Sequence, residues 1–253
     1  MSTDAGDVVA FVEGDREAPL PGDPAARESD RRLAASPPIR VEDPRERLDH
    51  WVFQSDQRLQ RPVPGSGQVG VPHIANLARA SFPARVLGPL DLRQEGQLQA
   101  AALDGRTGDF EVAGDLVAAE LPREALSVEA WVRLDRTQAW GGILGAMQDN
   151  GEYEKGFLLG YRDGRFGFAV NGVGGPDRLH WILAPSDLEL GRWHHVVGSY
   201  DGARQALFVD GVEVAAAEVE SGPIDYPDHG VYHLGAYRDD DEYFRLAGRV
   251  HEV

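Results

Sequence analysis

The feature that most constrains the fold of this chain is a strict alternation of side chains between Ser127 and Leu134. Every second residue of this stretch is apolar, and the residues between them are polar, charged or aromatic. The apolar set is Val128, Ala130, Val132 and Leu134, and the other set is Ser127, Glu129, Trp131 and Arg133. A period of two is the pattern of a β-strand that buries one face. The stretch is therefore predicted to be a strand beside a core.

Short apolar runs recur along the rest of the chain, and turn residues separate them. Asp163-Gly164 and Asp210-Gly211 each lie between two such runs. Asp-Gly suits two-residue hairpins, because the primed turns that join antiparallel strands need positive φ angles. Further strands are predicted at residues 50–53, 99–103, 143–147, 156–161, 166–170, 179–183, 193–200, 206–209, 212–216 and 231–236. Many short strands without helical periodicity predict an all-β fold, a two-sheet antiparallel β-sandwich.

The first part of the chain differs in composition from the rest. Residues 1–46 are rich in Asp, Glu, Arg, Pro and Gly, and they are predicted to form a mostly disordered, flexible N-terminal arm. One apolar patch at residues 8–12 has the β-branched content to pair as an edge strand. The sandwich is expected to occupy residues 47–253.

The charge and composition exclude several classes of partner. The formal net charge is −17, and such a surface repels nucleic acid and anionic lipid over a Debye length of roughly 8–10 Å. No apolar run approaches the roughly 18 residues of a membrane helix, so neither nucleic-acid binding nor membrane insertion is expected. There are no cysteines, which excludes disulfides and thiolate metal sites. The first residues show no secretory signal, and the compartment is left open.

Several segments together resemble one family. Residues 125–132 (ALSVEAWV), 191–202 (GRWHHVVGSYDG) and 207–211 (LFVDG) are similar to the consecutive strands of laminin-G-like jelly rolls. Residues 103–110, 234–236 and 248–253 (GRVHEV) resemble further segments of the same domains, in the same order. The resemblance covers about 200 residues and implies a concanavalin A-like jelly-roll sandwich.

A narrower resemblance, to a bacterial subgroup, rests on residues 140–143 (WGGI), 148–156 (QDNGEYEKG) and 235–244 (GAYRDDDEYF). In that subgroup the module is often one part of a larger protein, sometimes with a metallophosphoesterase domain. The resemblance implies a non-catalytic module that binds a carbohydrate or a protein. One alternative is a structural accessory domain that packs on a neighbouring hydrolase domain, and a remote alternative is a glycoside hydrolase.

The end of the chain departs from the family pattern. Related domains usually continue beyond the final Glu-Val, and their last strand commonly pairs near the first. The resemblance therefore implies a sandwich truncated at its C-terminal end, with a further C-terminal domain of the same polypeptide. It also predicts an unpaired edge near residues 50–53, and a chain extended at its C-terminus is expected to melt higher.

Candidate catalytic groups are few. The one run of alternating carboxylates, Glu13-Gly14-Asp15-Arg16-Glu17, lies in the predicted arm, where a loop cannot hold two carboxylates at the separation of about 5–9 Å that glycoside hydrolysis needs. His194 and His195 are adjacent in a predicted strand, so their side chains point to opposite faces and cannot share a metal ion. No catalytic residue is predicted.

Metal binding is the most credible chemistry. Asp104 and Asp109 flank a Gly-Arg-Thr-Gly loop that would let their carboxylates converge on a hard cation. The laminin-G-like resemblance implies a structural Ca²⁺, for which this loop is the candidate. The alternative is that both carboxylates cap their own turn.

Aromatic side chains near strand ends predict a ligand platform. Trp140, Tyr153 and Trp181 are candidates to stack on a sugar ring, although a sandwich buries many of its tryptophans. Asp239 begins a run of four acids through Glu242, which is predicted to be a solvated loop or the edge of a cation or ligand site. Two further tryptophans, Trp131 and Trp193, are expected in the core.

Overall fold

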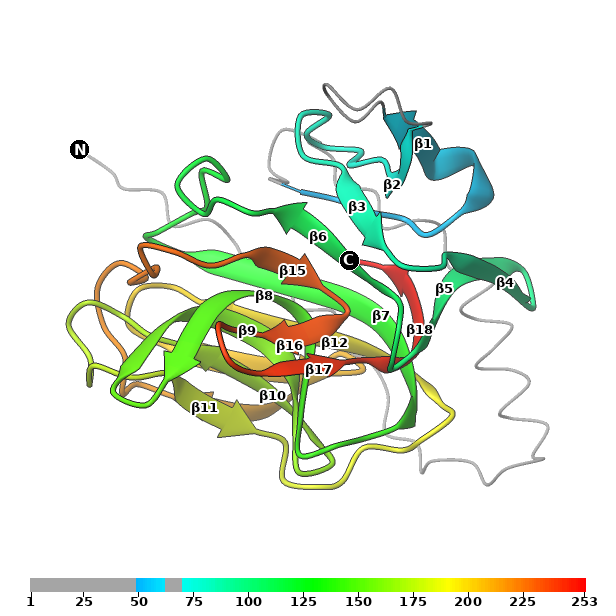
Figure 1. The fold of residues 1–253 in the computed structure, drawn as a ribbon. Helices are drawn as coiled ribbons and strands as arrows, with labels where there is room; N and C mark the ends of the chain where they lie inside the picture. The colour runs from blue at the N-terminus through cyan, green and yellow to red at the C-terminus, as the bar shows by residue number, and fades with distance from the viewer. Residues whose placement is uncertain (1–48, 62–69) are drawn as a thin grey trace, which may run out of the picture.

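The structure is a computed structural model that describes residues 49–61 and 70–253 (Figure 1). The predictions for residues 1–46, including the carboxylate run at residues 13–17 and the apolar patch at residues 8–12, lie outside the described residues. The described part holds one short 3-10 helix, η1 (Ser55–Gln57). No helix in this part is long and apolar enough to cross a membrane.

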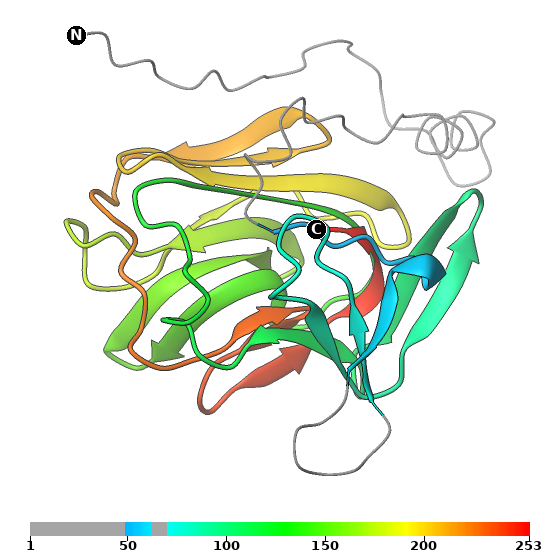
Figure 2. The ribbon, with the colours of Figure 1, turned by 90° about the horizontal axis from the view of Figure 1, so that it is seen from above.

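Two large antiparallel sheets face each other (Figure 2). The nine-stranded sheet has the order β1 (Arg58–Arg61), β2 (Val71–Ile74), β3 (Ala84–Leu87), β6 (Asp109–Ala113), β15 (Tyr232–Leu234), β8 (Trp140–Asn150), β9 (Tyr153–Arg162), β10 (Arg165–Val170) and β11 (His180–Leu183). The seven-stranded sheet has the order β14 (Val212–Ala217), β13 (Gln205–Val209), β12 (Trp193–Tyr200), β7 (Leu126–Arg136), β18 (Ala247–Glu252), β5 (Leu98–Asp104) and β4 (Asp91–Glu95). A separate hairpin is formed by β16 (Ala236–Arg238) and β17 (Tyr243–Arg245). The predicted two-sheet antiparallel β-sandwich is confirmed.

The predicted hairpin turns are present. Asp163 and Gly164 join β9 to β10 with φ angles of 49° and 76°, and Asp210 and Gly211 join β13 to β14 with φ angles of 52° and 81°. Positive φ at both central residues is the geometry that favours Asp-Gly. These turns fix the register of their strand pairs, and hence which side chains face the core.

The core lies between the two sheets, and β7 shows how the alternation builds it. Val128, Ala130, Val132 and Leu134 are all 5% exposed or less, whereas the residues between them are half-buried or exposed on the outer face. Burial of large apolar side chains contributes about 1.5–3 kcal/mol each relative to exposure. Strand β7 therefore contributes four side chains to the core between the two sheets.

The prediction that Trp131 and Trp193 lie in the core is wrong. Both are half-buried on the outer face of the seven-stranded sheet, because the inward positions of β7 and β12 are occupied by their alternating neighbours. The ring of Trp131 stacks on His195, with centroids 4.8 Å apart. The tryptophan in the core is Trp51, which is 1% exposed.

The two adjacent histidines point to opposite faces, as predicted. His194 is buried, and its Nδ1 lies 2.9 Å from Oδ2 of Asp210 at the next hairpin turn. His195 is half-buried on the outer face, where its Nε2 lies 3.2 Å from Oε2 of Glu129. The pair thus fixes the start of β12 from both sides of the sheet.

The first and last described segments of the sandwich pair with each other. The backbone N–H of Trp51 donates to the carbonyl of Val253, and the N–H of Val253 donates back to Trp51. The N–H of Phe53 donates to the carbonyl of His251. The unpaired edge predicted near residues 50–53 is therefore wrong, because the final residues of this chain already pair with it.

Candidate functional site

A second apolar cluster lies on the outer face of the nine-stranded sheet, away from the core. Strand register places Leu158, Ala169 and Trp181 side by side across β9, β10 and β11. Their chain neighbours point inward to the core, so these three point outward. We use the name aromatic surface for the four largest members of this outer cluster, which are Trp140, Trp181, Tyr237 and Phe244.

The four rings of the aromatic surface contact one another in sequence. Trp140 lies 5.6 Å from Trp181 and 5.7 Å from Tyr237, and Tyr237 lies 5.8 Å from Phe244, measured between ring centroids. These distances lie in the range of favourable aromatic pairs. Tyr237 is fully buried, whereas Trp140, Trp181 and Phe244 are only partly buried. The arrangement is a continuous apolar platform assembled from three regions of the sequence.

Glycine in β8 allows the aromatic surface to assemble. A Cβ atom on Gly142 would lie 2.1 Å from the carbonyl oxygen of Ala236, so any side chain there would push the β16–β17 hairpin away from β8. Figure 1 shows this hairpin in front of β8 and β9. The hairpin in turn carries Tyr237 and Phe244, which are opposite each other in its register. The guanidinium of Arg162 covers the ring of Trp140 at 4.1 Å, a cation–π contact.

Carboxylates border the aromatic surface on one side. The hydroxyl of Tyr237 donates to Oδ2 of Asp149 at 2.6 Å, and Asp149 is paired across β8 and β9 with Glu154. Oε2 of Glu154 accepts the backbone N–H of Leu179 at 3.1 Å. Burial, and then the charge of Asp149, raise the pKa of Glu154 above its usual value. We call Asp149, Glu154 and Asp239 the acidic rim.

Asp239 lies at the turn of the β16–β17 hairpin, and it is not a solvated side chain. Its Oδ1 accepts the backbone N–H groups of Asp241 and Glu242, at 3.0 and 2.6 Å. The residue is 9% exposed, and its Oδ2 has no hydrogen-bond partner among the described residues. Burial raises the pKa of Asp239 to about 6. The predicted solvated loop thus holds one buried acid at its base, while Asp240 and Asp241 are exposed.

Tyr153 lies at the tip of the β8–β9 hairpin, next to a different set of partners. Its ring stacks on His229 at 5.8 Å and 10°, and its hydroxyl accepts the backbone N–H of Asp228. His229 pairs with Asp240 at 2.9 Å, which connects this corner to the hairpin that carries Asp239. The structure therefore brings together Trp140 and Trp181 and places Asp239 on the neighbouring hairpin, whereas Tyr153 is outside the ring contacts of the aromatic surface.

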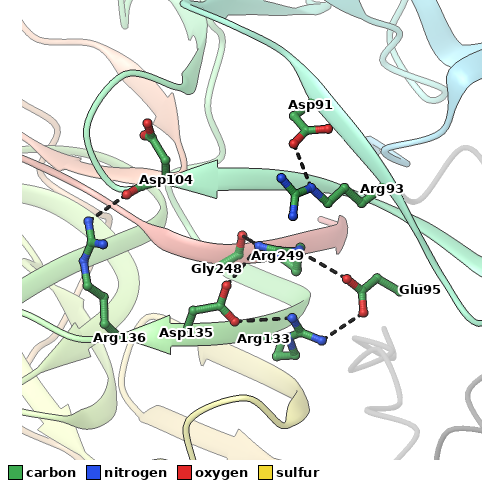
Figure 3. Close-up of polar contacts among 9 residues, drawn as sticks. All are labelled: Asp91, Arg93, Glu95, Asp104, Arg133, Asp135, Arg136, Gly248 and Arg249. Carbon is green, nitrogen blue, oxygen red and sulfur yellow. Dashed lines mark hydrogen bonds and ion pairs between the residues drawn. The ribbon is translucent and has the colours of Figure 1, made fainter.

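Asp104 is an exposed residue at the end of β5. Its Oδ1 accepts the backbone N–H groups of Arg106 and Thr107, and its Oδ2 accepts the hydroxyl of Thr107. These hydrogen bonds, the one from the Thr107 backbone first, lower the pKa of Asp104 to about 2. Figure 3 shows that Arg136 approaches the same residue from β7, where it donates to the backbone carbonyl. The Asp104 side chain thus caps its own loop.

Asp109 has a different environment. It is 0% exposed, it accepts the hydroxyl of Tyr243, and it lies 2.8 Å from Nε of Arg245. A guanidinium at this distance already neutralises the carboxylate and repels a divalent cation. The carboxylates of Asp104 and Asp109 each accept hydrogen bonds from different groups of the protein, so in this arrangement they do not fit a shared Ca²⁺. No group of three or more His, Cys, Asp or Glu in the described ranges is arranged to hold a metal ion, and calcium stays a prediction.

Sequence reasoning missed Tyr237, Phe244, Asp149 and Glu154. Tyr237 and Phe244 flank the acidic run at equal distances from its centre, which is the pattern of a hairpin with both aromatic rings on one face. That pattern predicts the hairpin. It does not predict that the hairpin lies against β8, because this contact depends on Gly142 and on long-range packing.

Comparison with known proteins agrees with this architecture. The profile of the concanavalin A-like lectin/glucanases superfamily matches residues 104–253. Pappalysin-1 of Mus musculus is 26% identical over 140 residues, which is 51% of this chain but only 8% of that protein. The chain therefore spans a small part of the length of the curated relatives that it matches.

Two solved structures share the fold. Domain 4 of AbnA, a GH43 extracellular arabinanase from Geobacillus stearothermophilus in complex with arabinotriose, has a TM-score of 0.53 at 15% identity, covering 81% of this chain and 90% of that one. A Trypanosoma rangeli sialidase in complex with 2,3-difluoro-KDN has a TM-score of 0.50 at 14% identity, covering 90% of this chain and 35% of that one. Because the family profile matches more than half of its residues, this chain belongs to the concanavalin A-like lectin/glucanases superfamily.

Proposed function

We propose that this domain is a non-catalytic glycan-binding module, and that a sugar ring stacks on the part of the aromatic surface that Trp140 and Trp181 form together. The observation that carries the proposal is the pair of partly buried indoles, 5.6 Å apart, on the outer face of a rigid sheet. Indole rings offer large apolar faces at low cost in conformational entropy, which suits the C–H faces of sugars.

The acidic rim supplies the polar half of the same site. Carboxylates accept hydrogen bonds from sugar hydroxyls, and Asp149 and Glu154 lie beside the rings with their positions fixed by Tyr237 and by the backbone of Leu179. A binding site of this kind combines an apolar platform with a few oriented polar groups. The arabinanase domain of the same fold, which was solved with arabinotriose, supports a sugar as the class of ligand.

The non-catalytic part of the proposal rests on how the rim carboxylates are used. Asp149 accepts a hydrogen bond from Tyr237, and Glu154 accepts one from a backbone N–H, so both are already engaged in holding the surface. The bacterial-subgroup resemblance and the small share of pappalysin-1 that matches both support a module that is one part of a larger protein. That this module is joined to further domains is part of the proposal.

The test is a glycan array with the isolated chain, followed by calorimetry on the best ligand. Trp181→Ala is expected to weaken binding about 10-fold or more, since losing one stacked aromatic ring removes on the order of 1–2 kcal/mol. Trp131→Ala is the matched control, because Trp131 is also a half-buried outer-face tryptophan but lies on the other sheet. It should leave affinity unchanged.

Three results would contradict the proposal. Equal loss of affinity in both variants would place the ligand elsewhere or indicate general unfolding, which a thermal melt distinguishes. Absence of any glycan ligand would favour the alternative of a structural accessory domain. Release of reducing sugar from a bound glycan would contradict the non-catalytic part, and the Glu154→Gln variant would then show whether the acidic rim is responsible.

A further inference from the structure

A polar cleft lies on the side of the sandwich opposite the aromatic surface, on the outer face of the seven-stranded sheet. It has a volume of about 250 Å³ and is lined by residues of β4, β5 and β18 together with the loop that follows β5. Ala102 on β5 is the register partner of Asp91 on β4 and of Arg249 on β18. Because alanine fills little space between the larger side chains of Asp91 and Arg249, the surface is hollowed there. None of the residues of the aromatic surface contributes to this cleft.

The guanidinium of Arg249 is held rigidly at one side of the cleft. Its Nε lies 3.2 Å from Glu95, and its Nη1 lies 2.9 Å from Asp135. Arg133 binds the other oxygens of the same two carboxylates, at 2.9 and 3.4 Å, which closes a ring of two arginines and two acids (Figure 3). Only 12% of the Arg249 side chain is exposed. Such a network fixes the position of a donor before any ligand arrives.

The ring leaves one donor of Arg249 unused. Its Nη2 has no hydrogen-bond partner among the described residues, although Arg249 lines the cleft. Arg93 lines the cleft from β4 and uses only its Nε, which donates to Asp91 at 2.7 Å. Both terminal nitrogens of Arg93 are therefore open to a ligand. The cleft thus presents charge-assisted donors from two arginines on different strands.

Among the described contacts, fewer carboxylate oxygens than guanidinium nitrogens of the cleft are left without a partner. Both oxygens of Asp104 are occupied by its own loop, at 2.7 to 2.9 Å. Of the Asp91 carboxylate, Oδ2 binds Arg93 and Oδ1 has no partner in the described part of the chain. A ligand that satisfies this set carries one carboxylate for the arginines and a nearby hydroxyl for Asp91. Guanidinium groups bind carboxylates through paired, directional hydrogen bonds.

We infer that this cleft binds the carboxylate-bearing sugar unit of an acidic glycan, such as a hexuronic or sialic acid residue. A volume of about 250 Å³ accommodates one monosaccharide unit. The inference rests on the proposed glycan-binding function and extends it, because it gives the domain a second subsite on the opposite sheet with a different selectivity. Neutral sugar units would bind at the aromatic surface, and acidic units in the cleft.

Calorimetry with the full chain tests this inference. The probes are oligosaccharides ending in glucuronic, galacturonic or sialic acid, each compared with its carboxyl-reduced analogue, in which a hydroxymethyl group replaces the carboxylate. We expect at least one acidic probe to bind about 10-fold or more tightly than its reduced analogue. Arg93→Ala should remove about 10- to 100-fold of that affinity, since it deletes charge-assisted hydrogen bonds. Arg93 is 57% exposed, so this variant should fold normally.

Arg192→Ala is the matched control, because Arg192 is also a partly exposed arginine paired with a nearby carboxylate, that of Glu189. It changes the net charge equally and should leave affinity for the acidic probe unchanged. Arg249→Lys keeps the charge but loses the planar fork, so it should weaken binding of the acidic probe while Trp181→Ala does not.

Four results would overturn the inference. The first two are equal affinity for every acidic probe and its reduced analogue, and equal losses of affinity for the acidic probe in Arg93→Ala and Arg192→Ala. The other two are loss of affinity for the acidic probe in Trp181→Ala but not in Arg93→Ala, and tighter binding of a free amino acid than of the sugars. Neutral glycan binding that depends on Trp181 would survive each of these results. Failure of this inference is therefore distinguishable from failure of the proposed function.

Discussion

The two outer faces of this sandwich share the alternating geometry of β-strands, but the two regions described above differ in chemistry. On the nine-stranded sheet the outward positions carry aromatic rings, and the β16–β17 hairpin lies against them. On the seven-stranded sheet the outward positions of β4, β7 and β18 carry arginines and carboxylates in a closed ring. Since alternation fixes only direction, the chemistry of each face is decided by the residue types at the outward positions.

The two faces also differ in how far their charged side chains are exposed to solvent. On the nine-stranded sheet charged groups are buried under the hairpin, where Asp109 is 0% exposed. On the seven-stranded sheet the charges are shared among several partners and stay near solvent, with Asp135 39% exposed. A buried charge depends strongly on its partner, whereas solvent-screened pairs contribute little each. The faces should therefore respond very differently to loss of one carboxylate.

The largest expected effect is that of Asp109→Ala. Removing this carboxylate leaves the guanidinium of Arg245 and the hydroxyl of Tyr243 without their buried partner. We expect the free energy of unfolding to fall by about 3 kcal/mol, measured by urea denaturation.

Asp135→Ala on the other face is the matched comparison. Its arginine partners keep Glu95 and contact solvent, so a loss of about 0.5–1 kcal/mol is expected. Similar losses for the two variants would break the contrast between a buried and a screened face.

The second effect is pH-dependent and concerns the hairpin on the nine-stranded sheet. The folded pKa of Asp239 is about 6, above its usual 3.8, so between these values the folded chain keeps a proton that the unfolded chain has released. Stability therefore falls as pH rises through this window. Asp239→Asn keeps an acceptor for the turn without the charge. It should raise the free energy of unfolding at pH 7 by on the order of 1–2 kcal/mol, and by much less near pH 4.

Thermal melts between pH 4 and pH 8 check this prediction. Asp240→Asn is the control, because Asp240 belongs to the same acidic turn but is exposed. A gain of stability from Asp239→Asn that is equal at all pH values would show that Asp239 stays charged in the folded chain, and the hairpin would then not bury an acid.

Much of this fold follows from local patterns. The alternation in β7 and the Asp-Gly turns at Asp163 and Asp210 predict strands, hairpins and faces, because these depend on neighbours in the sequence. The outward direction of Trp131 follows from the same alternation, in which Trp131 belongs to the outward set. Position in the period, and not the size of an apolar side chain, decides which residues of this strand reach the core.

The candidate site could be predicted only in part. Trp140 and Trp181 are visible as aromatic residues near strand ends, but their contact depends on the pairing of β8, β9, β10 and β11 across four strands. Asp104 and Asp109 are close in sequence, yet they lie at the end of one strand and the start of the next, and each meets a different long-range partner. Proximity along the chain indicates a shared site only where a single turn holds both residues.

The smallest expected effect is the difference between two ion pairs that both lie on the outer face of the seven-stranded sheet. A double-mutant cycle between Asp91 and Arg93, which are 50% and 57% exposed, should give a coupling energy of about 0–0.5 kcal/mol. The same cycle between Asp135 and the nearly buried Arg249 should give a larger value, about 0.5–1 kcal/mol, because less solvent screens that pair. Urea denaturation of the single and double variants measures both values.

The relative size of these two coupling energies matters for ligand binding in the cleft. A weak pair costs little to open, so Arg93 can turn from Asp91 toward a ligand, while Arg249 stays in its ring and presents a fixed donor. One adaptable and one rigid arginine is an arrangement that admits a charged group and then orients it. Coupling between Asp91 and Arg93 as strong as that between Asp135 and Arg249 would instead mean that Arg93 also belongs to a structural network, and the cleft would lose its adaptable donor.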